Sequence, residues 1–187
     1  MNQIINYRNQ NTPNGSIQGI KVLQLCCFTN LWGEQFQVES YDLRLKKDIF
    51  DIPQDYPGQF DLVCAAPPCD QFTKANAHHW QDYPEQFVKI AQLCFDLCKQ
   101  SGGLWFLENP PGRIEKFIPG LKQFRTINWR DPDGNKEYIL YSNFIIMQAP
   151  GKRYAAGRDG KRKFCNQSKK QREAWNPLLV ESIKSSI

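Results

Sequence analysis

The sequence has no long apolar run, and its opening residues lack the pattern expected of an amino-terminal leader. No stretch approaches the roughly 18 apolar residues of a membrane-spanning helix, and the opening residues, Met1 to Ile5, include no basic segment leading into an apolar one. We therefore expect a cytoplasmic protein with no membrane partner. Its 187 residues suffice to bury a single core; the oligomeric state stays open, with a monomer as the simplest case.

Histidine is scarce and the cysteine count is odd, which argues against a metal centre and against a disulfide framework. The chain has two histidines and seven cysteines, and their spacing matches no familiar zinc pattern. Five of the cysteines stand in apolar surroundings and are expected to be reduced core thiols: Cys26, Cys27, Cys64, Cys94 and Cys98. We expect no metal.

Two apolar, strand-like runs end in unusual polar motifs. The run that begins at Asp61 ends in Pro67-Pro68-Cys69, and the run that begins at Leu104 ends in Glu108-Asn109 followed by two prolines and a glycine. Proline cannot donate to a sheet and fixes its own φ, so each pair of prolines ends its strand in a stiff loop. In open α/β sheets such strand ends carry the chemistry. A buried cysteine that only fills space remains the alternative for Cys69.

These two motifs, in this order, resemble those of the DNA cytosine-5 methyltransferases. The family carries Pro-Cys after one strand and Glu-Asn after the next, as Pro68-Cys69 and Glu108-Asn109 do here. Its short, phage-type members also carry a Glu-Asn-Pro-x-Gly-Arg run and a Lys-x-x-x-Leu-Tyr/Trp segment, matched by residues 108–113 and 136–141. The resemblance covers roughly residues 20–150 and implies a cytoplasmic enzyme of a bacterial host without a separate target-recognition domain.

The chemistry implied by the resemblance explains the residue types at these positions. The Cys69 thiolate would add to carbon 6 of cytosine and make carbon 5 nucleophilic toward a methyl donor. Glu108, partly protonated, would hold the ring nitrogen and exocyclic amine of a flipped-out base. Asn109 would orient the loop. A solvated strand-end carboxylate is the alternative for Glu108.

The resemblance further implies S-adenosylmethionine as the donor, bound after the first strand. The candidate turn follows Val22 to Leu25, but Phe28 and Asn30 stand where the family has glycines that let the backbone approach the ligand closely. Asp42 follows the next strand at the spacing of a ribose-binding carboxylate, and Asp48 or Asp51 could contact the adenine. The full donor-binding set is Cys27, Phe28, Thr29, Asn30, Asp42, Asp48 and Pro67.

Alternating strand and helix signals predict an α/β protein. Apolar residues recur at helical spacing from Tyr83 to Gln100, and Gly102 and Gly103 are expected to end that helix in a left-handed cap. Alternation of this kind indicates a mostly parallel sheet covered by helices, and the resemblance implies that this is a Rossmann-like class I methyltransferase fold. The six expected strands lie at 20–27, 37–42, 60–66, 103–108, 124–129 and 137–146.

The loop after Cys69 is polar and rich in aromatic residues. Residues 70–82 are either a mobile lid that closes over a bound base or an ordinary surface loop with a buried Trp80. Candidate contacts to the substrate, taken from this loop and from the motifs around it, are Pro68, Thr73, Lys74, Arg113 and Lys136.

Positive charge is concentrated near the carboxyl end. Residues 151–173 hold nine Lys or Arg against two acidic residues, while the whole chain has a formal net charge of +5. Such a strip suits phosphate neutralisation, so DNA is the expected partner; a solubilising tail is the alternative. We expect a catalytic domain at 1–150, and at 151–187 a basic arm and a closing helix packed on that domain through Trp175, Leu178, Leu179 and Ile183.

The sequence leaves three functions open. The first is S-adenosylmethionine-dependent DNA cytosine-5 methylation. The second is a pyrimidine-modifying relative with an altered donor or substrate, such as RNA or a free nucleotide. The third is a degenerate methyltransferase-fold protein that binds nucleic acid or a partner protein and does not methylate. The altered turn at Phe28 and Asn30 decides between the first function and the third. A turn that still forms a donor pocket would favour methylation, and a blocked one would favour the binding protein.

Overall fold

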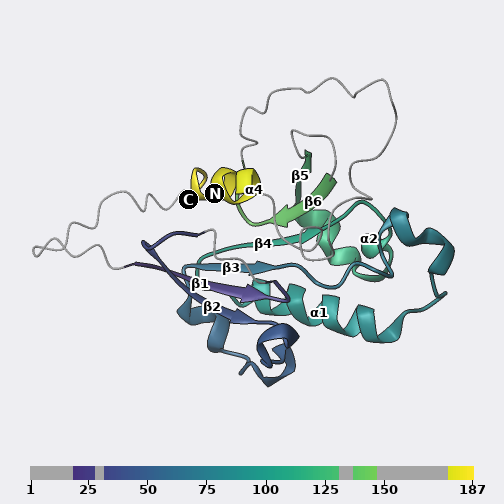
Figure 1. Ribbon diagram of the computed structural model, residues 1–187, viewed down its shortest axis with the longest axis horizontal. Helices are drawn as coiled ribbons and strands as arrows, with labels where there is room; N and C mark the ends of the chain where they lie inside the picture. The colour runs from purple at the N-terminus through teal and green to yellow at the C-terminus, as the bar shows by residue number, and fades with distance from the viewer. Residues whose placement is uncertain (1–18, 28–31, 131–136, 147–176) are drawn as a thin grey trace, which may run out of the picture.

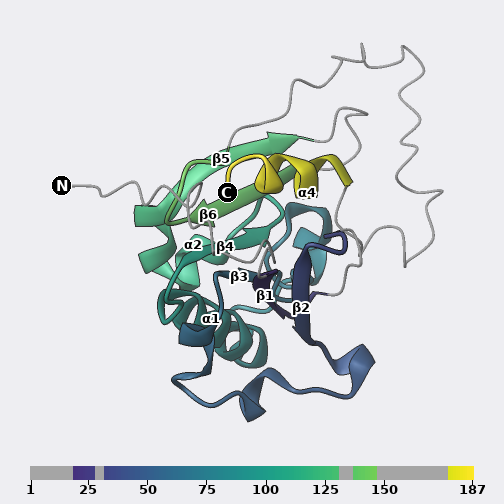
Figure 2. The ribbon, with the colours of Figure 1, turned by 90° about the vertical axis from the view of Figure 1, so that its left-hand side faces the viewer.

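The computed structural model describes residues 19–27, 32–130, 137–146 and 177–187. Within them the chain forms a six-stranded sheet with helices on both faces (Figures 1 and 2). The strands are β1 (Ile20–Leu25), β2 (Phe36–Tyr41), β3 (Leu62–Ala65), β4 (Leu104–Asn109), β5 (Arg125–Arg130) and β6 (Glu137–Ser142). The helices are α1 (Glu85–Lys99), α2 (Ile114–Phe117) and α4 (Pro177–Lys184), and short 3₁₀ turns include η1 (Leu43–Leu45), η2 (Ile49–Asp51), η3 (Tyr56–Gln59), η4 (Lys74–His79) and η5 (Pro119–Phe124).

The sheet order is β2-β1-β3-β4-β6-β5. Strands β2, β1, β3 and β4 pair in parallel, whereas β6 is antiparallel to both β4 and β5. Only residues 131–136 separate β5 from β6, which is too short for the crossover that parallel neighbours need. The structure confirms the α/β class, the mostly parallel sheet and all six expected strands, within two residues at their starts and four at their ends.

Side chains that alternate along the strands build two cores. One face carries Leu23, Val63 and Leu107 and is covered by α1 through buried residues at helical spacing, among them Ala91 and Cys98. The opposite face is covered by α4 through Leu179, Val180 and Ile183, which pack with Val22, Trp32, Leu62 and Phe106. Because β3, α1 and β4 form a parallel crossover unit, the carboxyl ends of β3 and β4 lie side by side at the same end of the sheet.

The glycines after α1 have a different role from the expected one. Helix α1 ends at Lys99 without a left-handed cap, and neither Gly102 nor Gly103 has a positive φ. A Cβ on Gly103 would lie 2.4 Å from the Asp61 carbonyl oxygen, and one on Gly102 would lie 2.8 Å from that of Gly58. The prediction of a left-handed cap was wrong; these glycines allow the start of β4 to approach the segment before β3.

Candidate functional site

The sheet reverses its strand order between β1 and β3. From this central pair the chain goes outward to β2 on one side and to β4 on the other. In open α/β sheets, ligands bind at the carboxyl ends of the strands where such a reversal occurs. The candidate residues that follow β1, β2, β3 and β4 therefore lie along one edge of the sheet, with the motifs of Cys69 and Glu108 on adjacent strands.

Cys69 lies in a tight turn directly after β3. Its carbonyl oxygen accepts hydrogen bonds from the amides of Phe72 and Thr73, both at 2.8 Å, while the side chain of Phe72 is fully buried beneath the turn. Pro67 is buried, whereas Pro68 and Cys69 are half-buried, and Cys69 forms no disulfide. The turn thus holds a half-accessible thiol on a backbone that is anchored on both sides.

Asn109 joins the two motifs. Its Nδ2 donates to the carbonyl oxygen of Pro67 at 3.1 Å, and the side chain is fully buried. Successive side chains of a strand point to opposite faces, so Glu108 shares the face of Phe106 and α4, while Asn109 shares the α1 face with Leu107. Glu108 is 5% exposed. The residue expected to orient the Cys69 turn is therefore in contact with it.

A second contact links the loop after Cys69 to the turn after β4. We call residues 66–84 the Cys69 loop and residues 109–113 the Asn109 turn. Thr73 and Gly112 form an antiparallel bridge, in which the Lys74 amide donates to the Pro111 carbonyl at 3.1 Å and the Arg113 amide donates to the Phe72 carbonyl at 2.9 Å. A Cβ on Gly112 would lie 1.7 Å from the Phe72 oxygen, so only glycine permits this approach.

The predicted substrate contacts have different local surroundings. Thr73 caps η4, where its Oγ1 accepts from the Ala75 amide at 3.4 Å, and Lys74 is exposed. Trp80 is half-buried and donates from Nε1 to the Thr73 carbonyl at 3.1 Å. Arg113 donates to the Cys69 loop, as described below. Lys136 and the basic segment 151–173 lie outside the described residues.

On the donor side, Asp42 is tied to Arg44. Asp42 is buried at the end of β2 and caps η1. Its Oδ1 accepts from the backbone amide and Nε of Arg44, both at 2.8 Å, and its Oδ2 accepts from Nη2 at 2.6 Å. Burial raises the pKa of Asp42, but the Arg44 hydrogen bonds outweigh it and lower the pKa below its usual range. Both oxygens that a ribose would need are engaged.

The remaining donor-binding candidates are only partly described. Cys27 is buried, and its pKa is raised by that burial and by a hydrogen bond with Cys64, which makes it a core thiol. Asp48 caps η2 by accepting from the Phe50 amide at 3.1 Å. Phe28, Thr29 and Asn30 lie outside the described residues. In the described part of the β1–β2 connection, the positive φ values fall at Cys26 (54°) and Gly33 (90°).

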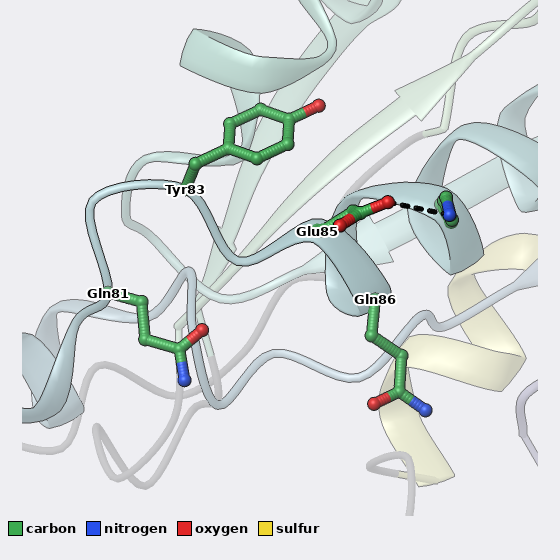
Figure 3. Close-up of a pocket in the computed structure, with 5 residues that line it drawn as sticks. Gln81, Tyr83, Glu85 and Gln86 are labelled. Atoms are coloured by element: carbon green, nitrogen blue, oxygen red, sulfur yellow. Dashed lines mark ion pairs between the residues drawn. The ribbon is translucent and has the colours of Figure 1, made fainter.

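The hollow drawn in Figure 3 is separate from these residues. It lies where the Cys69 loop enters α1 and is lined by Gln81, Tyr83, Glu85, Gln86 and Lys89. Two of these lining residues, Glu85 and Lys89, form an ion pair at 2.7 Å. Neither a metal-holding group of three or more His, Cys, Asp or Glu nor a helix able to cross a membrane occurs in the part of the chain that the structure describes.

Two residues that shape this site were missed at the level of sequence. Arg44 could have been suspected from the Asp-Leu-Arg spacing, since an Asx turn brings residue i+2 back to the carboxylate. Gly112 stands in the quoted motif, but its contact with the backbone of Phe72 joins positions 40 residues apart.

No known family profile matches the chain, and no curated protein matches its sequence significantly.

Proposed function

We propose that the chain is a DNA cytosine-5 methyltransferase-like protein with a Rossmann-like fold. The observation that carries the proposal is the contact from Asn109 Nδ2 to the Pro67 carbonyl, because it joins the two motifs on which the resemblance rests. The strand reversal beside Cys69 supports a ligand site at the same edge.

In this proposal each residue has a distinct role. The Cys69 thiolate forms a bond to carbon 6 of cytosine, and Glu108 steadies the base at its ring nitrogen and amine. S-adenosylmethionine, if bound near Asp42, would supply the methyl group for carbon 5 and would leave as S-adenosylhomocysteine. Loss of the carbon 5 proton then expels the thiolate and restores the ring. Asn109 and the turn that it begins keep the Cys69 loop against β4.

A ribose that bonded to both oxygens of Asp42 would have to displace at least one Arg44 donor, because Oδ1 already accepts two hydrogen bonds while Oδ2 accepts one from Arg44. The side-chain donors of Arg44 that it would meet lie at 2.8 and 2.6 Å. The pairing of Asp42 with Arg44 is the observation that favours an alternative function, that of a methyltransferase-fold protein which binds nucleic acid without methylating. Whether the donor binds therefore depends on whether its ribose can compete with Arg44 for Asp42.

Calorimetric titration with S-adenosylmethionine, with and without duplex DNA, separates the two functions. Wild type should bind, Asp42→Ala should lose binding, and Arg44→Met should bind more tightly because the competing guanidinium is gone. If neither wild type nor Arg44→Met binds S-adenosylmethionine, the methyltransferase function is excluded and the function of a nucleic-acid-binding protein remains.

Transfer of a labelled methyl group tests the chemistry. Duplex DNA, RNA and free cytidine nucleotide are offered as acceptors, and the product is identified as 5-methylcytosine. Cys69→Ser should abolish transfer, while Cys98→Ser, a matched change at a buried thiol whose Sγ lies 3.8 Å from the Phe106 carbonyl oxygen, should preserve it. Transfer only to RNA or to the nucleotide would favour the relative with an altered substrate.

A further inference from the structure

Arg113 directs its side chain at the Cys69 loop. Its Nε donates to the Gln71 carbonyl at 2.9 Å and its Nη2 to the Gln81 carbonyl at 2.6 Å. The guanidinium carbon lies 4.4 Å from the centre of the Trp80 ring and 5.1 Å from that of Phe117. One side chain of the Asn109 turn therefore holds two carbonyls ten residues apart.

The segment between those carbonyls is closed on itself. The Gln81 amide donates to Oε1 of Gln71 at 2.8 Å, and Nε2 of Gln71 donates to the His79 carbonyl at 3.2 Å. Arg113 bridges the two ends of this closed segment, residues 71–81, and its own backbone amide bonds Phe72. Cys69 precedes the closed segment by two residues, and Glu108 precedes Arg113 by five.

We propose that Arg113 is a positioning residue that fixes the Cys69 loop relative to Glu108, and that it is not a contact to nucleic-acid phosphate. A phosphate-binding arginine presents its planar fork of donors to the ligand. Here Nε and Nη2, which form one edge of the fork, both donate to carbonyls of the Cys69 loop, and two aromatic rings flank the group. The catalytic part of this inference rests on the proposed function, whereas the structural part does not.

Two variants and a control test the inference. Arg113→Met keeps the apolar stem between the rings and removes all donors. Arg113→Lys keeps the charge, but its single ammonium group cannot reach the carbonyls of both Gln71 and Gln81. Lys116→Ala is the control, because Lys116 also lies over the Phe117 ring, at 5.6 Å, and makes no hydrogen bond to the loop in the described structure.

The first readouts need no enzymatic activity. Hydrogen–deuterium exchange of a peptide spanning 70–82, and the rate of Cys69 alkylation by iodoacetamide, should each rise about tenfold in Arg113→Met. Arg113→Lys should show a smaller rise and Lys116→Ala none. Unchanged exchange and alkylation in Arg113→Met would overturn the inference even if methyl transfer is found. A rise in both would support it even if wild type transfers no methyl group.

If transfer is detected, the kinetic constants give an independent test. Loss of positioning should lower kcat with little change in KM for DNA. A raised KM with unchanged kcat, together with a weaker salt dependence of DNA binding, is the behaviour of a lost phosphate contact and would overturn the inference.

Discussion

Replacing Gly112 with alanine should destabilise the protein and open the Cys69 loop. The new Cβ would lie 1.7 Å from the Phe72 carbonyl oxygen, where contacts under 3.0 Å are essentially never seen. The Asn109 turn and the loop must therefore part by more than 1 Å. Such a shift breaks the hydrogen bonds from Arg113 to Phe72, at 2.9 Å, and from Lys74 to Pro111, at 3.1 Å.

The size of the expected loss of stability follows from these broken hydrogen bonds. Two backbone hydrogen bonds are worth about 1–3 kcal/mol together, and residual overpacking adds about 1 kcal/mol or more. We expect Gly112→Ala to lower the free energy of unfolding by about 2–4 kcal/mol. Urea titration followed by tryptophan fluorescence should show this as a lower midpoint with an unchanged slope, and Cys69 should be alkylated faster in the folded variant.

Gly58→Ala is the matched control for this prediction. Its Cβ would meet only the Gln100 carbonyl oxygen, at 3.7 Å, which is an ordinary contact, and Gly58 has no positive φ. The control should lie within about 1 kcal/mol of wild type, because alanine chiefly restricts the unfolded chain there. A midpoint for Gly112→Ala equal to that of the control would refute the close approach on which the loop arrangement depends.

Three further predictions concern the rest of the fold. Because the pKa of Asp42 is lowered in the folded state, its ionised form stabilises the fold above the unfolded pKa of about 3.9, and this stabilisation is lost as the pH falls through the folded pKa. The urea midpoint should therefore fall less between pH 5 and pH 3 in Asp42→Asn than in wild type. An equal fall of the midpoint in both proteins would contradict the pairing of Asp42 with Arg44. Ile183→Ala should cost about 2–4 kcal/mol in the same titration, since Ile183 is fully buried on α4, and a loss under about 0.5 kcal/mol would argue against the docking of this helix. Burial raises the pKa of Cys98, so native-state alkylation read by mass spectrometry should label Cys69 and spare Cys98 until urea is added, whereas early labelling of Cys98 would contradict its burial.

The strands and the long helix could be predicted because their signals are local. Apolar residues at a spacing of 3.6 residues fix which face of α1 is buried, and short apolar runs bounded by proline or glycine fix the strands. The antiparallel β6 was also within reach, since a six-residue connection cannot make a crossover. The predicted α/β class with a mostly parallel sheet depended on such local patterns.

Apart from Arg44, whose contact with Asp42 is local, the error and the omission share a cause, which is contact between segments far apart in the sequence. Gly103 is required by the Asp61 carbonyl and Gly112 by that of Phe72, and neither partner can be read from neighbouring residues. The same holds for Arg113, whose bonds to Gln71 and Gln81 are set by the packing of one loop on another.

The connection between β1 and β2 bears on which ligand the site can take. Parallel neighbours are usually joined by a dozen or more residues that include a helix, yet residues 26–35 make this connection and contain no helix in their described part. The face beside β1 is covered by α4 from the other end of the chain, which packs with Val22 and Trp32.

A dinucleotide site depends on the helix after the first strand, because the positive end of that helix holds the pyrophosphate. S-adenosylmethionine carries no phosphate, and the methionine carboxylate is the one anionic group that a helix amino terminus could hold. The described parts of this connection, residues 26–27 and 32–35, contain no helix that could hold a ligand phosphate in this way. For the proposed donor, a ribose contact to both oxygens of Asp42 would have to displace at least one of the hydrogen bonds from Arg44, so the strength of the Asp42–Arg44 pair is the quantity that the calorimetric comparison of wild type with Arg44→Met tests.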